Sequence, residues 1–321
     1  MVVKKTEVTV MKIPKRLMLF FLVTISVFIL SSCDFHDDTD GDWSNPGVLV
    51  NPMENQTLPD VPQTRFAQLE SAKWLEQGDY RVGEAIPAGE YYLETYHPSL
   101  EAFFQIQGNT EGGIRKAYSF FNFCFVQLKE GDSISVKFAR MIPAETVPPI
   151  QEMPDFSYDA GVYRIGKDIP AGEYYFRAIE NGWTLVQVLT DYPEFDNPAA
   201  RSNSVLKDGD ISNSLYMTVN EGVYLSVQGA IFYPKEQAPL PKAEGGRYRE
   251  GMYLVGRDIE AGQYKITVTD KELGGHYYIL SNANWDVSNG FVAAREVKRS
   301  KTISVENGQY LHVSRAYFEK K

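Results

Sequence analysis

The chain has 321 residues, of which 43% are hydrophobic, 13% aromatic and 23% charged, which is the composition of a folded globular protein. Its formal net charge is −10, and the first 32 residues hold five of the 32 basic and one of the 42 acidic side chains, which leaves −14 for the rest. This balance argues against nucleic acid as a partner and against adhesion of the folded part to an anionic bilayer, because both need clustered Lys and Arg.

The N-terminal segment has the pattern of a secretory signal peptide. A basic region with Lys12, Lys15 and Arg16 precedes a run of 14 apolar or small residues, 17–30. Such a run is too short for a comfortable span of the roughly 30 Å hydrocarbon core of a bilayer. We therefore assign residues 1–32 to a signal peptide, and Met11 is a better start than Met1 because the basic region follows it directly.

Residues 30–33 read Leu-Ser-Ser-Cys, which resembles the bacterial lipobox. In proteins with that motif the Cys thiol takes a diacylglycerol, cleavage occurs just before the Cys, and the new N-terminus is acylated, commonly with palmitate. The resemblance implies that Cys33 is the first residue of the mature protein and that its lipid holds the chain on the outer, extracytoplasmic face of the cell membrane. The alternative is an uncleaved membrane anchor followed by a chance Cys, and it also tethers the protein to a membrane.

Residues 33–64 are acidic, rich in Asn and Pro, and without sustained periodicity, so we expect a flexible tether. The stretch HDDTDGD at 36–42 is superficially similar to a calcium loop. A loop that begins at His36 would need a bidentate Glu at its twelfth position, where Gly47 stands. Solvated charge is the better interpretation.

One motif occurs three times after the tether. YRVGEAIPAGEYY, YRIGKDIPAGEYY and YLVGRDIEAGQYK occupy residues 80–92, 163–175 and 253–265, and six of their first twelve positions are identical. Repetition at such a spacing indicates tandem modules. The predicted boundaries are 65–141 for module 1, 157–233 for module 2 and 247–319 for module 3.

Each motif predicts a strand, a turn and a second strand. Residues alternate with a period of two on both sides of a Gly-containing loop. In the second strand Tyr91 should face inward and Tyr92 outward, and the same holds for Tyr174 and Tyr175. Asp168 and its counterpart in module 3 precede the loop Ile, where we expect a cap on the turn rather than a catalytic or calcium role.

The remaining elements are also strands. We expect strands at 103–107, 183–189 and 276–280, and a closing hairpin in each module around the Glu-Gly or Asn-Gly pairs at 130–131, 221–222 and 307–308. Pro-containing segments at 142–154 and 233–246 join the modules. Residues 65–79 could form a short amphipathic helix. The predicted fold is all-β, with three tandem small antiparallel β-sandwich modules.

No catalytic constellation stands out. The four histidines, His36, His97, His276 and His312, are dispersed, and no P-loop, dinucleotide fingerprint or nucleophile elbow is present. We expect His312 to be solvated on the outer face of its strand. Cys124 has no partner for a disulfide, and we expect it to be a small buried hydrophobic residue. We expect no metal, no cofactor and no enzymatic activity.

Aromatic residues form the remaining candidate site. Alignment of the closing segments places Phe123 and Phe125 outward, next to the outward Tyr92 and Tyr175. One account is that residues 65–79 or the next module cover this apolar face. The sharper hypothesis is an exposed platform for a sugar ring or a partner protein.

The repeated motif behind a lipobox resembles the modules of uncharacterised exported lipoproteins of bacteria, especially Gram-positive ones. The resemblance covers residues 78–318 and implies no reaction; only Cys33 carries over, as the site of lipidation. We therefore expect a membrane-anchored lipoprotein whose modules bind a cell-wall glycan or an envelope protein, or act as a spacer. The alternative is an envelope enzyme, or an accessory subunit of an enzyme or transporter.

Overall fold

The computed structural model describes residues 65–109, 113, 115–179, 184–194, 205–210, 213–285 and 290–321, with backbone only for 205–210. The predicted signal peptide, Cys33 and the tether lie outside these residues. The described residues belong to one compact unit. None of their helices is long and apolar enough to cross a membrane.

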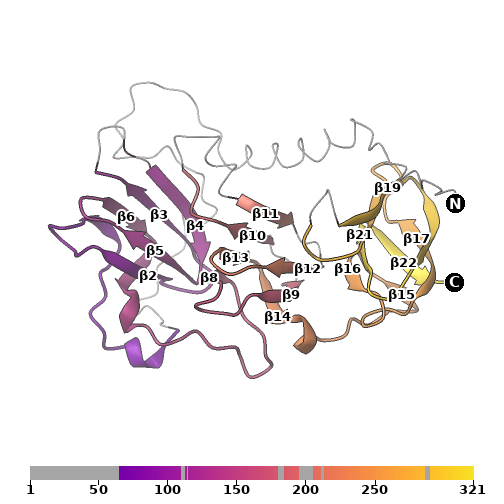
Figure 1. The fold of residues 1–321 in the computed structure, drawn as a ribbon, viewed down its shortest axis with the longest axis horizontal. Coiled ribbons are helices and arrows are strands. Elements are labelled where there is room, and N and C mark those ends of the chain that lie inside the picture. Colours follow the sequence, from indigo (N-terminus) through magenta and orange to yellow (C-terminus); the bar gives the residue numbers. More distant parts are fainter. Residues whose placement is uncertain are drawn as a thin grey trace, which may run out of the picture. The chain divides into compact units, whose positions relative to one another are not determined.

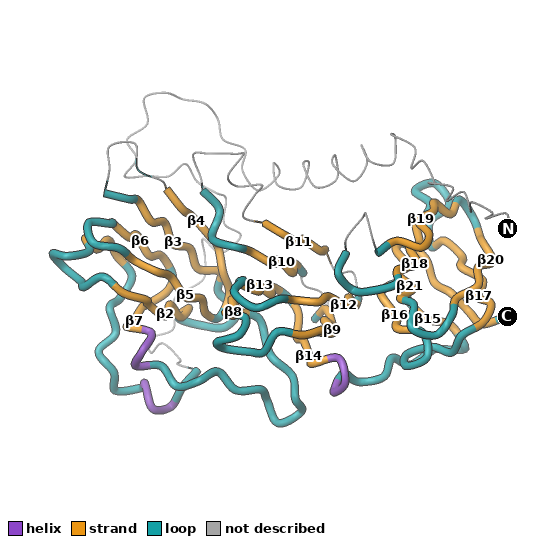
Figure 2. The backbone as a smooth tube through the Cα atoms, viewed as in Figure 1, coloured by secondary structure: helices purple, strands orange, loops and turns teal. Residues whose placement is uncertain are grey.

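The prediction of an all-β fold is confirmed. Strands and loops make up nearly all of the described chain (Figure 2), and its helical segments are three single 3₁₀ turns. These are η1 (Ala67–Leu69), η2 (Ala144–Thr146) and η3 (Lys235–Gln237).

Module 1 is a sandwich of two antiparallel sheets. Its strands are β1 (Gly78–Arg81), β2 (Gly89–Thr95), β3 (Glu101–Gln107), β4 (Arg115–Phe121), β5 (Phe123–Leu128), β6 (Ser133–Lys137) and β7 (Ala139–Pro143). One sheet has the order β1-β6-β3-β4 and the other β5-β2-β7, and β3, β4 and β6 can be followed side by side in Figure 1.

Module 2 repeats this topology. Its strands are β8 (Gly161–Arg164), β9 (Gly172–Ala178), β10 (Leu185–Leu189), β11 (Val205–Asp210), β12 (Ser214–Val219), β13 (Tyr224–Gln228) and β14 (Ala230–Pro234). The sheet orders β11-β10-β13-β8 and β12-β9-β14 match those of module 1 strand for strand.

Module 3 has the same plan with one added edge strand. Its strands are β15 (Arg247–Tyr248), β16 (Gly251–Leu254), β17 (Gly262–Val268), β18 (Gly275–Leu280), β19 (Phe291–Val297), β20 (Ser300–Val305), β21 (Tyr310–Ser314) and β22 (Ala316–Lys320). The sheets are β16-β21-β18-β19 and β15-β22-β17-β20.

The predicted closing hairpins are wrong. In module 1, β5 pairs with β2 whereas β6 pairs with β1 and β3, so the turn at 130–131 carries the chain from one sheet to the other. The turns at 221–222 and 307–308 do the same. Two strands that each show one face to a shared core have the same period-two pattern whether they pair directly or lie in opposite sheets.

Two backbone hydrogen bonds join the repeated motif to the turn that carries the chain from one sheet to the other, which we call the arch. The N–H of Gly131 donates to the Val82 carbonyl at 3.1 Å, and the N–H of Val82 donates to the Asp132 carbonyl at 2.8 Å. Modules 2 and 3 repeat both bonds, at Ile165 and Val255. The arch glycine has φ +83° in module 1, a conformation that glycine adopts without steric cost.

The two motif tyrosines fasten the backbone at either end of the loop. Each hydroxyl donates to the carbonyl four residues earlier, which explains a Tyr at these inward positions better than burial alone. The pairs are Tyr80–Glu76, Tyr91–Pro87, Tyr163–Asp159, Tyr174–Pro170, Tyr253–Arg249 and Tyr264–Glu260, at 2.6 to 2.9 Å.

The predicted turn cap is confirmed in modules 2 and 3. The Asp168 carboxylate accepts a hydrogen bond from the Arg164 N–H at 2.7 Å, and Asp258 accepts one from the Leu254 N–H at 2.8 Å. Module 1 has Ala85 at this position and lacks the cap.

Residues 65–79 contain η1 but no longer helix, so the amphipathic helix is not formed. Beyond η1 the chain passes through turns and bends, and Leu75 forms a β-bridge with Met141 of β7. Phe66, Ala72 and Trp74 pack against buried residues of the shared core. The segment keeps an apolar side, but that side lies against a sheet, whose edge also offers backbone hydrogen bonds.

Candidate functional site

The four aromatic residues expected on an outer surface are buried. Tyr92 and Phe123 have no exposed area, and Phe125 and Tyr175 retain 1% and 5%. The strand pattern places them on the outer faces of their sheets as expected, but other parts of the chain cover those faces. An exposed platform for a sugar or a partner is therefore wrong for these side chains.

Two neighbours cover the face of module 1. Phe66 and Trp74 lie against Tyr92, with ring centroids 6.0 and 6.3 Å away. Phe123 packs edge-on to Tyr163 of module 2 at 5.0 Å. Both covers named in the alternative account, residues 65–79 and the next module, are thus present.

Charged and polar groups frame this first interface. The Arg164 guanidinium lies 3.3 Å from the ring centre of Phe125 and 2.8 Å from a carboxylate oxygen of Glu90. Lys167 is 2.5 Å from the same carboxylate. Burial would raise the pKa of Glu90, but the hydrogen bonds from Lys167 and Arg164 lower it overall.

The second interface uses the same strands one module later. β5 contacts β8 in the first interface, and β12 contacts β16 in the second. The Tyr216 hydroxyl donates to the Asp258 carboxylate at 2.7 Å, and Tyr310 donates to Glu173 at 2.5 Å. Glu173 stands where Glu90 stands in module 1, so the motif glutamate of each module reaches the module that follows.

A homologous asparagine marks both interfaces. Asn122 precedes β5 and its amide donates to the Ala160 carbonyl at 2.8 Å, while Asn213 precedes β12 and donates to the Glu250 carbonyl at 2.9 Å. Both acceptors lie at the entry to the first strand of the next module. The modules therefore stack head to tail through one repeated geometry.

The series of modules is polar at both ends. The second residues of β8 and β16 are Val162 and Met252, with 1% and 0% exposed, and the matching strand β1 of module 1 has the exposed Asp79 there. At the other end, Thr302 and Lys265 replace the Phe125 and Tyr92 that module 1 buries. Polar outer faces are what terminal repeats of an array need for solubility.

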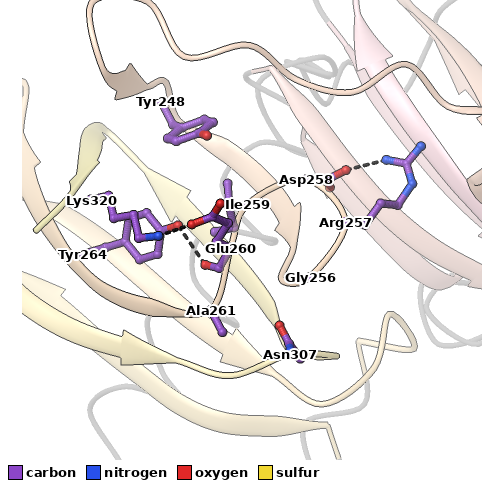
Figure 3. Close-up of a pocket in the computed structure, with 10 residues that line it drawn as sticks. All are labelled: Tyr248, Gly256, Arg257, Asp258, Ile259, Glu260, Ala261, Tyr264, Asn307 and Lys320. Carbon is purple, nitrogen blue, oxygen red and sulfur yellow. Dashed lines mark hydrogen bonds and ion pairs between the residues drawn. The ribbon is translucent and has the colours of Figure 1, made fainter.

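A hollow of about 600 Å³ lies beside the motif loop of module 3 (Figure 3). Its open side carries Glu260 and Lys320, whose side chains are 81% and 48% exposed and form an ion pair. Deeper in the loop, the Asp258 carboxylate is fully buried and pairs with Arg257. The lining residues are Tyr248, Gly256, Arg257, Asp258, Ile259, Glu260, Ala261, Tyr264, Asn307 and Lys320.

The groups in this hollow are engaged in holding the loop. The Asp258 carboxylate accepts from the Leu254 N–H and from Tyr216, and the Tyr264 hydroxyl donates to the Glu260 carbonyl at 2.8 Å. Burial raises the pKa of Tyr264 to about 12, so it stays protonated at neutral pH. The arrangement offers hydrogen bonds to a small polar ligand but no pair of groups poised for acid–base chemistry.

His312 is half-buried between aromatic rings, whereas we expected a solvated imidazole. Tyr278 stacks on its imidazole at 5.7 Å and Trp285 meets it edge-on at 5.4 Å. Its Nδ1 is shielded from solvent and has no hydrogen-bond partner among the described residues, and burial lowers its pKa to about 4. The indole Nε1 of Trp285 donates to the Tyr216 carbonyl at 2.9 Å. The Trp285 ring therefore contacts both His312 of module 3 and Tyr216 of module 2.

Cys124 is fully buried, as predicted, and is not in a disulfide. Burial raises the pKa of its thiol well above the ordinary value, which makes it a poor nucleophile. Within the described ranges, no group of three or more His, Cys, Asp or Glu side chains could hold a metal ion.

Comparison with known proteins found no matching family model and no similar curated protein.

Proposed function

We propose that the chain is a lipid-anchored, extracytoplasmic, non-enzymatic protein whose stacked β modules form a stiff support at the cell envelope. The observation that carries the proposal is the pair of homologous interfaces between modules. Phe123 and Tyr216, the aromatic residues at their centres, have no exposed area. Modules joined by flexible linkers alone would expose these rings to water, at a cost of about 2 kcal/mol for each large apolar side chain.

The anchor rests on the sequence around Cys33. A basic region, a short apolar run and the lipobox-like LSSC follow one another as in exported lipoproteins, and an acidic tether separates them from module 1. Mass spectrometry of the mature N-terminus tests this part. We expect a diacylated or triacylated Cys33 as the first residue, and an unmodified Cys33 would refute it. Cys33→Ser should release the protein from the membrane fraction.

Stiffness can be tested separately. Glu84 in module 1 and Glu306 in module 3 are exposed, and spin labels on cysteines placed there in a Cys33→Ser background report the distance between these modules. Cys124 is fully buried and should not react. We expect a single narrow distance distribution. A broad one, as flexible linkers give, would overturn the proposed support role and leave the lipid anchor unaffected.

A further inference from the structure

The face of module 3 that corresponds to the stacking faces of modules 1 and 2 is not covered by another module in the described part of the chain. We define the terminal face as the outer side of β20, β17 and β22 together with the connection from β19 to β20. Its positions match those that seat the next module in modules 1 and 2, since Arg299 stands where Asn122 and Asn213 stand. The backbone bond is the same in all three: Asn122, Asn213 and Arg299 each accept from the strand beside them at 2.8 to 3.0 Å.

The terminal face is basic although the protein is acidic. Residues 157–233 hold five basic and ten acidic side chains, whereas residues 247–321 hold twelve basic and nine acidic. The cations on or beside the terminal face are Arg247, Lys265, Lys298 and Arg299. On its strands the single carboxylate is Glu319, which lies 3.4 Å from Arg247 and 4.0 Å from Lys265.

Hydroxyl groups lie along the same face. Ser300, Thr302 and Ser304 are exposed and alternate along β20, so they recur at intervals of roughly 6.8 Å. The neighbouring Thr267 has a buried Oγ1 that finds no hydrogen-bond partner in the described part of the chain. The face therefore offers a row of hydrogen-bonding groups next to a cluster of positive charge.

We propose that the terminal face of module 3 binds a linear polyanion that carries phosphate groups along its length. Lys and Arg pair with phosphate oxygens, and the alternating hydroxyls of β20 donate to the same oxygens along an extended chain. Lys298 and Arg299 are adjacent and exposed in the connection that leads into β20, and Lys265 lies opposite Thr302 on the same face, which places positive potential at one end of the row and beside its centre.

A polymer fits this face better than a membrane surface does. Stable adhesion to a bilayer draws on apolar side chains as well as charge. None of the exposed large hydrophobic residues of the described chain lies on the strands of this face; the nearest in sequence are Leu273 and Val292, and they belong to a loop and to the opposite sheet.

This binding site goes beyond the proposed support function and does not depend on it. The mature chain with Cys33→Ser is titrated with inorganic polyphosphate, with orthophosphate, and with vesicles that contain phosphatidylglycerol, each in 50 mM and 200 mM salt. We expect binding of polyphosphate that weakens about 50-fold between the two salt concentrations, as for four neutralised phosphates. Orthophosphate and vesicles should bind at least tenfold more weakly.

The triple variant Lys265→Gln, Lys298→Gln, Arg299→Gln should lose at least tenfold in affinity for polyphosphate. The matched control changes three exposed lysines of module 1 to Gln, namely Lys73, Lys129 and Lys137, and should bind like the parent. Thermal unfolding of both variants checks that they fold. Equal losses of affinity in the two triple variants would show that binding depends on net charge alone and would overturn the proposed site. Absence of polyphosphate binding at 50 mM salt, or preference for vesicles, would overturn it as well.

Discussion

A single methyl group added at Gly161 should disturb the packing of module 1 against module 2. It opens β8 with φ +152°, and a Cβ built on it would lie 2.4 Å from Cε1 and 2.7 Å from Cζ of Phe123. Carbon atoms in contact prefer 3.5 to 4.0 Å, so the ring would have to move by more than about 1 Å. Phe123 has no free space to enter, because Tyr92 and Phe125 lie against it at 5.8 and 6.1 Å.

Gly161→Ala should therefore destabilise the protein strongly. Overpacking of a full core costs about 1–3 kcal/mol, and a non-glycine residue held at positive φ adds about 1–3 kcal/mol. We expect a loss of about 2–6 kcal/mol in the free energy of unfolding, measured by urea denaturation of the mature Cys33→Ser chain. Addition of Phe123→Leu should restore part of the steric share.

Gly172→Ala is the matched control. Gly172 belongs to the same module, and a Cβ there would meet no atom within 4 Å, so we expect a change of less than about 1 kcal/mol. If Gly161→Ala proves as mild as Gly172→Ala, the interface around Phe123 is not close-packed, and the argument for stacked modules fails with it.

Three further substitutions test single contacts. Ala85→Asp supplies module 1 with the turn cap of the other modules and should raise the free energy of unfolding by about 1 kcal/mol in urea titrations. Burial lowers the pKa of His312 from 6.5 to about 4, so the free energy of unfolding is unaffected by this group above pH 6.5 and falls by about 3 kcal/mol as the pH drops toward 4. His312→Gln should flatten this fall, measured as melting temperature against pH. An unchanged slope would contradict the prediction. Glu90 has a pKa that burial would raise but the bonds from Lys167 and Arg164 lower, so its stabilisation is present above pH 4.5 and lost as the pH falls through the lower folded value. Glu90→Gln should remove that acid-side loss, which calorimetry at pH 3–5 would detect.

The alternation of side chains predicted which residues face each module's own core. Tyr91, Tyr174 and Tyr264 are buried as expected, at 2%, 2% and 1% exposed. The same alternation did not distinguish a hairpin from an arch, because both present one face per strand to the core. The choice depends on which strand pairs with which, and a period-two pattern does not show that.

The candidate site failed for a related reason. Phe123 and Phe125 were correctly placed on an outer face, but an outer face of one module is an inner face of the stack. One available signal was the contrast between copies: Phe125 and Tyr216 give way to Thr302 in module 3. His312 gave no such signal, since the rings of Tyr278 and Trp285 that cover it come from distant parts of the chain.

The motif glutamate also differs according to the position of its module in the chain. Glu90 and Glu173 each bind the module that follows, and Gln263 occupies the position in the last copy. The copies are therefore no longer interchangeable: a fourth copy inserted by duplication, or two copies exchanged by recombination, would bring a polar face against an apolar one. A further junction between modules would require both of its partner faces to change together.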